Sequence, residues 1–144
     1  MSKILQWVAL TSTAQGPTQA HDDDAGFDLY VDGDWVVQPN QFVDIPLGIA
    51  TKLPAGTWGL LTGRSSTLRR LGLMVTQGVI DCGYTGPLFA GVWNMTQFPV
   101  DVKHGDRIAQ FIIMQNVAED TITQKVISLP NTQRGSKGFG SSGK

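Results

Sequence analysis

Short runs rich in β-branched and aromatic residues recur along this chain of 144 residues, and helical periodicity is scarce. The runs cover residues 4–10, 35–37, 42–45, 57–62, 88–93 and 108–114. Turn-forming pairs such as Asp32-Gly33 and His104-Gly105, and many of the 17 glycines, separate them. This spacing predicts an all-β sandwich, barrel or jelly roll.

One short helix is expected within this β framework. Ser65 or Ser66 would cap its N-terminus, and Gly72 would end it. Leu68 and Leu71, three positions apart, would face the protein interior. No internal repeat or linker divides the chain before residue 133, so residues 1–133 are expected to form one domain.

Residues 134–144 differ from the rest, because they place one large apolar residue, Phe139, in a background of glycine and serine. Such a segment cannot bury enough surface to order itself, which predicts a flexible C-terminal arm. A frayed terminus is the ordinary interpretation. However, Arg134, Lys137 and the serines can bind phosphate, and Phe139 offers a flat stacking surface. The arm is therefore also a candidate lid over a nucleotide.

The composition limits the partners and the setting of the protein. Hydrophobic residues make up 41% and charged residues 16%, which suffices for a packed core, and the net charge of -1 predicts no bulk attraction to nucleic acid or membrane. Cys82 is the only cysteine, so no intrachain disulfide can form. No apolar run is long enough to span a bilayer. We therefore expect a cytoplasmic protein.

The segment Gly63-Arg64-Ser65-Ser66-Thr67 precedes the expected helix. Helix N-termini offer unpaired N–H groups to phosphate, and an arginine adds a fork of donors. The same residues would equally form an ordinary serine cap beside a surface arginine, and the segment alone leaves both interpretations open.

Residues 78–86 combine an apolar pair, Val79-Ile80, with Asp81 and three glycines that would frame a tight hairpin. An aspartate at the end of a buried strand can act as a general base, although turn aspartates are common. Tyr84 by itself is more typical of a core or surface aromatic residue. Cys82 has no histidine near it in the sequence, so it is expected to fill a small space in the packing.

Two further segments carry candidate polar residues. Asp28 lies between apolar neighbours in Ala25-Gly26-Phe27-Asp28-Leu29-Tyr30 and is a candidate for a partly buried carboxylate. In Gly105-Asp106-Arg107-Ile108-Ala109-Gln110, Asp106 is expected to bond turn amides, while Gln110 would reach a ligand or point to solvent. His21 and His104 lack metal-ligand spacing and are expected at the surface.

Taken together, five segments resemble the motifs of the trimeric dUTPase family, in the family's order. They read AGFDLY, GRSST, GVIDCGYTG, GDRIAQ and RGSKGFGSSG, and they extend from Ala25 to Gly143. Any one of them is weak, but five in order are highly specific. The resemblance implies a β jelly roll, a homotrimer with shared active sites, and hydrolysis of dUTP to dUMP and pyrophosphate with Mg²⁺ held mainly by substrate phosphates and water.

The resemblance also implies roles for individual residues. Asp81 would activate the water that attacks the α-phosphorus, and Asp28 would support it as a second carboxylate near the sugar. Tyr84 would pack under the deoxyribose, and the hairpin backbone from Val75 to Val79 would read uracil. The implied substrate-binding residues are Arg64, Ser65, Ser66, Val75, Gly78, Val79, Ile80, Tyr84, Gln110, Arg134, Gly138, Phe139, Gly140, Ser141 and Ser142.

The chain departs from the family's pattern at three positions. Gly83 stands where many members carry a second aspartate, and Val75 where some place an asparagine that contacts uracil. Gly63 replaces a frequent proline before the arginine. Recognition of the base would then rest wholly on backbone groups.

Two alternatives remain open from the sequence. dCTP deaminase shares the implied fold, but its chemistry needs an acid/base group near the base ring, and Glu119 is the only glutamate of the chain. The second alternative is a protein of this fold that acts mainly by binding a regulatory protein partner, which the sequence does not identify.

Overall fold

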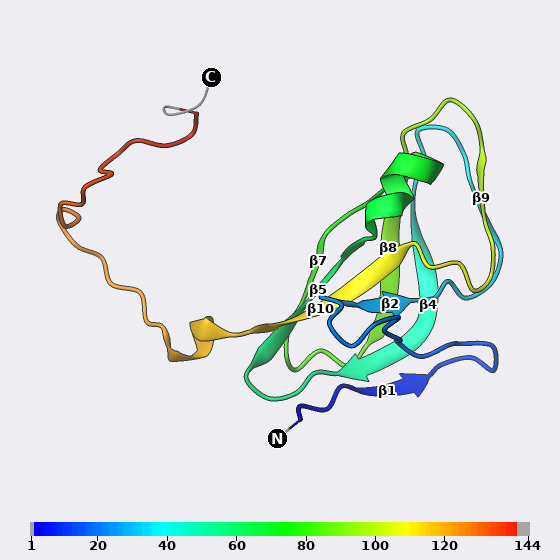
Figure 1. Cartoon of the computed structure of the whole chain (residues 1–144), viewed down its shortest axis with the longest axis horizontal. Coiled ribbons are helices and arrows are strands. Elements are labelled where there is room, and N and C mark those ends of the chain that lie inside the picture. Colours follow the sequence, from blue (N-terminus) through cyan, green and yellow to red (C-terminus); the bar gives the residue numbers. More distant parts are fainter. Residues whose placement is uncertain (1, 141–144) are drawn as a thin grey trace.

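The computed structural model describes residues 2–140, which form two four-stranded antiparallel sheets, a two-stranded sheet and an extended C-terminal arm (Figure 1). The first sheet has the order β1-β4-β8-β6, with bounds Gln6–Ala9, Phe42–Lys52, Pro87–Asn94 and Leu73–Val75. The second has the order β2-β10-β5-β7, with bounds Phe27–Leu29, Ala109–Gln115, Thr57–Gly63 and Gly78–Ile80. The small sheet pairs β3 (Trp35–Val37) with β9 (Val100–Val102). The all-β prediction is confirmed.

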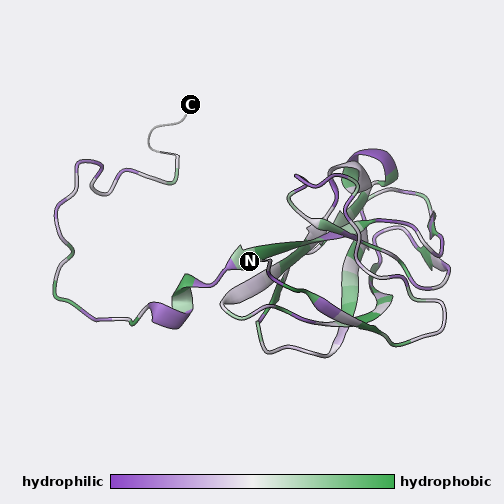
Figure 2. Cartoon of the chain, turned by 60° about the horizontal axis from the view of Figure 1, so that its bottom comes forward, coloured by the Kyte–Doolittle hydropathy of each residue, from purple (hydrophilic) through white to green (hydrophobic). Residues whose placement is uncertain are grey.

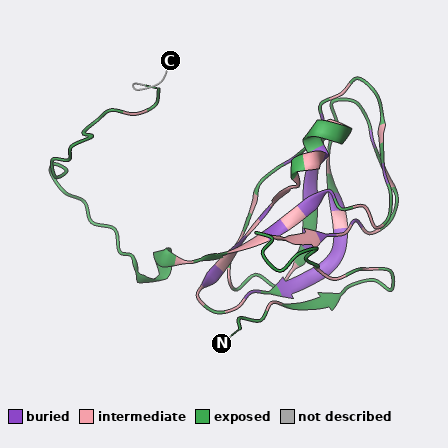
Figure 3. Ribbon diagram, in the orientation of Figure 1, coloured by how far each residue is buried: buried purple, intermediate pink, exposed green. Residues whose placement is uncertain are grey.

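The core lies between the two larger sheets, since their inward-facing residues alternate with exposed ones. On β8, Leu88, Ala90 and Val92 are buried, whereas Phe89 and Trp93 are exposed. Phe111 on β10 is fully buried. Figure 2 shows many hydrophobic residues in the strands, and Figure 3 shows that the strands also hold most of the buried residues. No helix within residues 2–140 is long and apolar enough to cross a membrane.

β4 is much longer than the expected 42–45, because the chain continues as a strand through Pro46 and Gly48. The register with β8 shifts between Pro46 and Ala50, so β4 bulges there. Gly48 has a φ of 71°, and a Cβ at this position would lie 2.8 Å from Asp32 Oδ2. Pro46 and Gly48, which the sequence indicated as the end of this strand, therefore mark a bulge inside it.

The expected helix forms as a single wide turn, η1 (Thr67–Leu71), and Gly72 ends it in the left-handed conformation at φ 68°. Its amide donates to Leu68 O at 3.0 Å. The inward orientation expected for Leu68 and Leu71 is wrong, because these residues are 43% and 36% exposed. The buried residue is Thr67, whose hydroxyl donates to Ile108 O at 2.7 Å. This bond directs the side of the helix that carries Thr67 toward the sheet.

The chain leaves the sheets after Gln115, passes through a short 3-10 turn, η2 (Val117–Asp120), and continues as an exposed arm to residue 140 (Figures 1 and 3). The departure comes before the expected boundary at residue 134, whose position stays a prediction. Ile122, Ile127 and Leu129 on this arm are at least 82% exposed. The arm therefore adds little to the core of its own chain.

Asp32 joins the N-terminal segment to the body of the protein. The hydroxyls of Thr11 and Thr13 each donate to its carboxylate at 2.7 Å, and the Asp32 side chain is only 10% exposed. These bonds, Thr13 first, together with the charge of His104, hold the pKa of Asp32 below its ordinary value of 3.8, against an opposing effect of burial.

A lowered carboxylate pKa makes stability dependent on pH. Because folding favours ionised Asp32, its contribution is fully present above its unfolded pKa and is lost as the pH falls through its folded pKa. We expect Asp32→Asn to lower the free energy of unfolding at neutral pH, and this deficit to shrink from about pH 5 to about pH 3. Denaturant titrations at fixed protein concentration measure it. Asp101→Asn, on an exposed residue, controls for the charge change, and a deficit that persists unchanged at pH 3 would contradict the linkage.

Candidate active site in two halves

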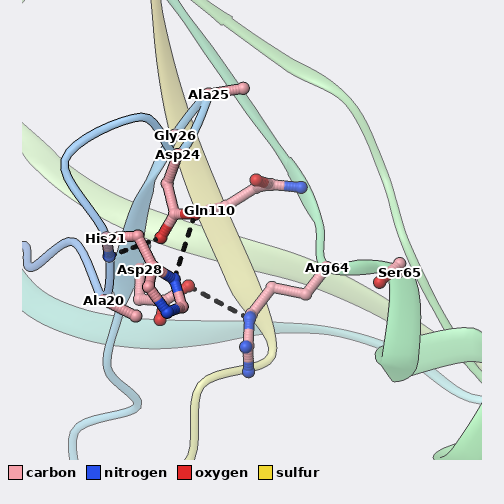
Figure 4. A pocket seen from close by; sticks show the side chains of 9 residues that line it. All are labelled: Ala20, His21, Asp24, Ala25, Gly26, Asp28, Arg64, Ser65 and Gln110. Atoms are coloured by element: carbon pink, nitrogen blue, oxygen red, sulfur yellow. Dashed lines mark hydrogen bonds and ion pairs between the residues drawn. The ribbon is translucent and has the colours of Figure 1, made fainter.

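An open cavity of about 330 Å³ lies where β2, β10 and the turn before η1 meet, and Figure 4 shows its lining. It is lined by Ala20, His21, Asp24, Ala25, Gly26, Asp28, Arg64, Ser65 and Gln110. Three of the four polar sequence segments therefore contribute to it: the Asp28 segment, the Arg64 segment and the Gln110 segment. We call this cavity the arginine half-site.

Asp28 is the central anion of the arginine half-site. Arg64 Nε lies 3.0 Å from its Oδ1, and Arg107 Nη1 lies 3.3 Å from its Oδ2. The Asp28 side chain is 15% exposed, as its position between apolar neighbours predicted. Both carboxylate oxygens are paired, so Asp28 fixes two arginines in place. Figure 4 shows Arg64 and Asp28 directed toward each other from the turn and from β2.

Backbone contacts hold Arg64 as firmly as its ion pair does. Arg64 N donates to Ile108 O at 3.3 Å, and Arg64 Nη1 donates to Arg107 O at 3.1 Å. Ser65 lines the cavity, whereas Ser66 stands at the helix N-cap and its side chain makes no capping bond. The serine hydroxyls are therefore not used to cap this helix.

Gln110 completes the arginine half-site from β10, directly opposite Asp28 in the strand register. Its Nε2 donates to Gly63 O at 3.0 Å, and its amide extends away from Asp28 (Figure 4). Gly26 leaves the space that this side chain occupies, because a Cβ at Gly26 would lie 2.9 Å from Gln110 Oε1. The sequence left open whether Gln110 faces a ligand or solvent, and the structure places it at the cavity.

Asp81 and Tyr84 belong to a second cavity, of about 250 Å³, which we call the aspartate half-site. Asp81 follows β7 directly and is exposed, and Tyr84 N donates to Asp81 O at 3.0 Å across a tight turn. Tyr84 OH donates to Pro87 O at 2.9 Å, which fixes the ring. The apolar part of the lining is formed by Val79, Ile80, Pro87, Leu88 and Phe89.

The hairpins expected in this region are absent from the described residues. β7 pairs with β5 in one sheet, whereas β6 and β8 pair with each other in the other sheet. The chain therefore switches sheets at residues 76–77 and again at the Asp81–Tyr84 turn. Among the residues expected to read uracil, Val75 is buried at 6% exposure, and Val79 is 67% exposed. Local apolar and glycine spacing indicated the turns correctly but not the strand partners.

Within one chain the two half-sites lie far apart. β2 and β7 are the opposite edges of the sheet β2-β10-β5-β7. Asp28 pairs in register with Gln110, and Ile80 aligns through Gly59 with Ile113. Three strand spacings and about four residues along the strands separate Asp28 from Asp81, which corresponds to roughly 20 Å between their Cα atoms. One chain therefore does not bring the two carboxylates to one reacting atom.

The described arm residues of the expected site line neither half-site. Arg134 Nε donates to Lys137 O at 2.7 Å within the arm, and Phe139 is fully exposed with a φ of 49°. Gly138 and Gly140 flank that ring, and Gly140 has a φ of 91°. Ser141 and Ser142 lie outside the described residues.

Sequence reasoning missed Arg107, which pairs with Asp28 beside the arginine half-site, and correctly assigned its neighbour Asp106. Arg107 was not a candidate, although it immediately precedes the strand that carries Gln110. Asp106 acts structurally as expected, since Lys103 N donates to its Oδ2 at 2.8 Å. His21 is exposed but lines the cavity beside Asp24, with Nδ1 3.5 Å from Asp24 Oδ1. His104 accepts a hydrogen bond from Gly33 N at 2.9 Å.

The described residues thus combine an all-β fold with a largely buried aspartate between two arginines and a separate, exposed aspartate, an arrangement suited to binding an anionic ligand. The dUTPase family model matches residues 12–143. A deoxyuridine 5'-triphosphate nucleotidohydrolase of Mycolicibacterium gilvum is 37% identical over 99% of this chain and 97% of its own length. A deoxyuridine 5'-triphosphate nucleotidohydrolase of Paramecium bursaria Chlorella virus 1 is also 37% identical, over 93% and 94%.

A solved structure supports the same assignment. The Staphylococcus bacteriophage 80alpha dUTPase with dUPNHPP superposes with a TM-score of 0.92 at 27% identity, over 99% of this chain and 100% of that one. The chain therefore belongs to the dUTPase family and is a dUTP diphosphatase, as the five motifs predicted.

Gly26 provides a test of how the arginine half-site is packed. We expect Gly26→Ala to displace Gln110, because the added Cβ would also lie 3.3 Å from Phe111 O, which cannot move without disturbing β10. The KM for dUTP should rise by about tenfold or more if Gln110 binds phosphate. Steady-state kinetics with a melting curve measure the effect. An unchanged KM in a folded variant would show that Gln110 does not contact the substrate.

Proposed function

We propose that Asp81 activates the water that attacks the α-phosphorus of dUTP. In the described residues its carboxylate makes no hydrogen bond or ion pair, and it lies at the mouth of a cavity. A carboxylate with free lone pairs can accept a proton from water. Asp28, by contrast, has both oxygens paired with arginines, which favours a supporting role: it orients Arg64 and Arg107 and takes no proton.

The arginine half-site supplies the phosphate contacts in this proposal. Arg64 uses Nε and Nη1 for protein partners, which leaves further guanidinium donors for phosphate oxygens. Ser65, Ser66 and Gln110 add uncharged donors around it. Because donors already fixed in place need no reordering during the reaction, they can neutralise charge on a triphosphate as the α-phosphorus is attacked.

Magnesium fits this site as an ion bound by the substrate. Among residues 2–140, no three His, Cys, Asp or Glu side chains gather closely enough to hold a metal ion, and Asp28 is already occupied by arginines. Phosphate oxygens and water are common Mg²⁺ ligands. When bound, the ion would neutralise phosphate charge. A mutant dUTPase from phage phi11 of S. aureus, described with a structural Mg(II) ion, is 24% identical to this chain at a TM-score of 0.74, a likeness of fold alone.

Tyr84 would discriminate against ribose in this arrangement. Its hydroxyl is fixed to Pro87 O, and Gly86 packs so closely that a Cβ there would lie 2.6 Å from the hydroxyl oxygen. A ring held in this way cannot turn aside for an added 2′-hydroxyl, which would also lose its hydrogen bonds to water. We therefore expect UTP to be a far poorer substrate than dUTP.

The separation of the half-sites is the observation that carries the proposal of a homotrimer with shared active sites. If one chain contributes Arg64 and another Asp81, the roughly 20 Å within each chain ceases to matter. The outer face of the β1-β4-β8-β6 sheet is suited to such contacts. Phe42 pairs with Trp93 and Met74 pairs with Trp93 across it, and these residues are 38–55% exposed.

Complementation between two inactive variants tests the shared site. We expect Arg64→Ala and Asp81→Asn each to lose almost all turnover alone, because one cannot bind phosphate and the other cannot accept a proton. When the two are unfolded and refolded together in equal amounts, about a quarter of the sites should contain both native halves. Mixtures without any recovered turnover would place both halves in one chain. Turnover retained by Asp81→Asn alone would show that the base lies elsewhere.

Deleting residues 134–144 tests the arm as a lid. Residues 134–140 of this segment are almost all exposed, so the melting temperature should barely change. Stacking of Phe139 on uracil, worth roughly 1–3 kcal/mol, and phosphate contacts from Arg134 and the serines would order the triphosphate, so kcat should fall by more than KM rises. An unchanged kcat would show that the arm does not act as a lid. A large loss of thermal stability would show that the arm has a structural role instead.

The deaminase alternative receives no support from the position of Glu119. This residue lies in η2, outside both half-sites, and is exposed. A pyrophosphate-release assay across dUTP, dCTP, dTTP and UTP, with and without magnesium, tests the substrate directly.

A further inference from the structure

Lys52, the last residue of β4, extends its ammonium group to the turn that carries Asp81. Lys52 Nζ donates to Cys82 O at 3.2 Å, across 30 positions of sequence, and to Leu53 O at 3.3 Å. The same nitrogen lies 3.9 Å from Cys82 Sγ. One ammonium group thus bridges the end of a strand in the first sheet and the turn that leaves β7 of the second.

Cys82 makes a second contact with the β4–β5 connection, in which the turn donates the hydrogen bond. Its thiol donates to Pro54 O at 3.5 Å, and its side chain packs partly buried against the core. The turn is therefore joined to the β4–β5 connection by one bond that it accepts and one that it donates. Because Cys82 follows Asp81 directly in the chain, any shift of the Cys82 backbone moves Asp81 with it.

Apart from the pairing of Ile80 with Gly59 at the end of β7 and the packing of Ile80 against the core, the turn has few other restraints near Asp81. Tyr84 N donates to Asp81 O, which closes the turn on itself but does not anchor it elsewhere. Gly83 adds none, since a Cβ at this position would meet no heavy atom within 4 Å. The Asp81 side chain has no bonding partner among residues 2–140, so its backbone alone sets where the carboxylate lies.

We infer that Lys52 is a positioning residue for Asp81. An ammonium group makes charge-assisted hydrogen bonds to both carbonyls at once, which a neutral side chain of this length cannot do. Lys52 would not touch the reacting atoms. It would hold the turn so that the carboxylate meets the attacking water in a fixed geometry, and small misplacements of reacting groups lower rates strongly. The inference rests on the proposed role of Asp81.

Lys52→Met keeps the aliphatic length and removes the ammonium group. We expect kcat for dUTP to fall by about tenfold or more, with KM within about twofold, because the substrate contacts stay in place. Lys52→Arg, which can still donate to two carbonyls, should recover most of the turnover. Lys3→Met removes an exposed ammonium group outside both half-sites and should leave kcat unchanged.

Amide hydrogen exchange provides a readout that does not depend on the reaction. Exchange across residues 81–85 should be faster in Lys52→Met than in the wild type or Lys3→Met, while the melting temperature stays the same. Cys82→Ala, which removes the other contact but keeps the Cys82 carbonyl, should also speed exchange, and the double variant more than either.

Each outcome decides a different point. Unchanged exchange in Lys52→Met would overturn the restraint itself. Faster exchange with unchanged kcat would show that Lys52 holds the turn without positioning Asp81. Turnover retained by Asp81→Asn would show that Asp81 is not the base. The exchange data would still decide whether Lys52 fixes the turn. If Lys52→Met does not fold, amide exchange and kcat of Lys52→Arg and of Cys82→Ala are each compared with those of the wild type instead.

Discussion

The paired carboxylate of Asp28 holds together three segments that are far apart in sequence. It receives Arg64 from the turn after β5 and Arg107 from the turn before β10, and it stands on β2 itself. Because the Asp28 side chain is largely buried, losing both arginines would leave its charge without compensation. The positions of both arginines, and with them the geometry of the arginine half-site, depend on this one anion.

The contrast between Asp28 and Asp81 shows how two aspartates acquire different chemistry. Asp28 is enclosed by guanidinium groups and serves as a fixed counter-charge, whereas Asp81 stands on a turn with free lone pairs. The sheet keeps them at opposite edges, so under the proposed mechanism charge organisation and proton transfer are separated within each chain. Assembly of chains would then bring the two functions together at one substrate.

The sequence predicted what depends on local residues. Short β-rich runs between turn signals indicated the all-β class, and Gly72 marked the helix end because only its own φ decides that position. Contacts between distant residues were not predictable in this way. Thr67 faces the sheet through a bond across 41 positions, and Arg107 reaches Asp28 across 79. The sheet partners of β7 and β8 likewise depend on strands elsewhere in the chain, so the expected hairpin was wrong although its turn was correct.

The position of β1 has a consequence for the newly made protein. This strand forms one edge of its sheet, all four of its residues are exposed, and Trp7 and Val8 present apolar surface there. An open apolar edge is a template for pairing with any available strand. If chains assemble as proposed, a freshly released chain would either join its neighbours or pair through this edge with other unassembled chains. The yield of assembled enzyme would then depend on how quickly chains find one another, a kinetic property that no single folded subunit possesses.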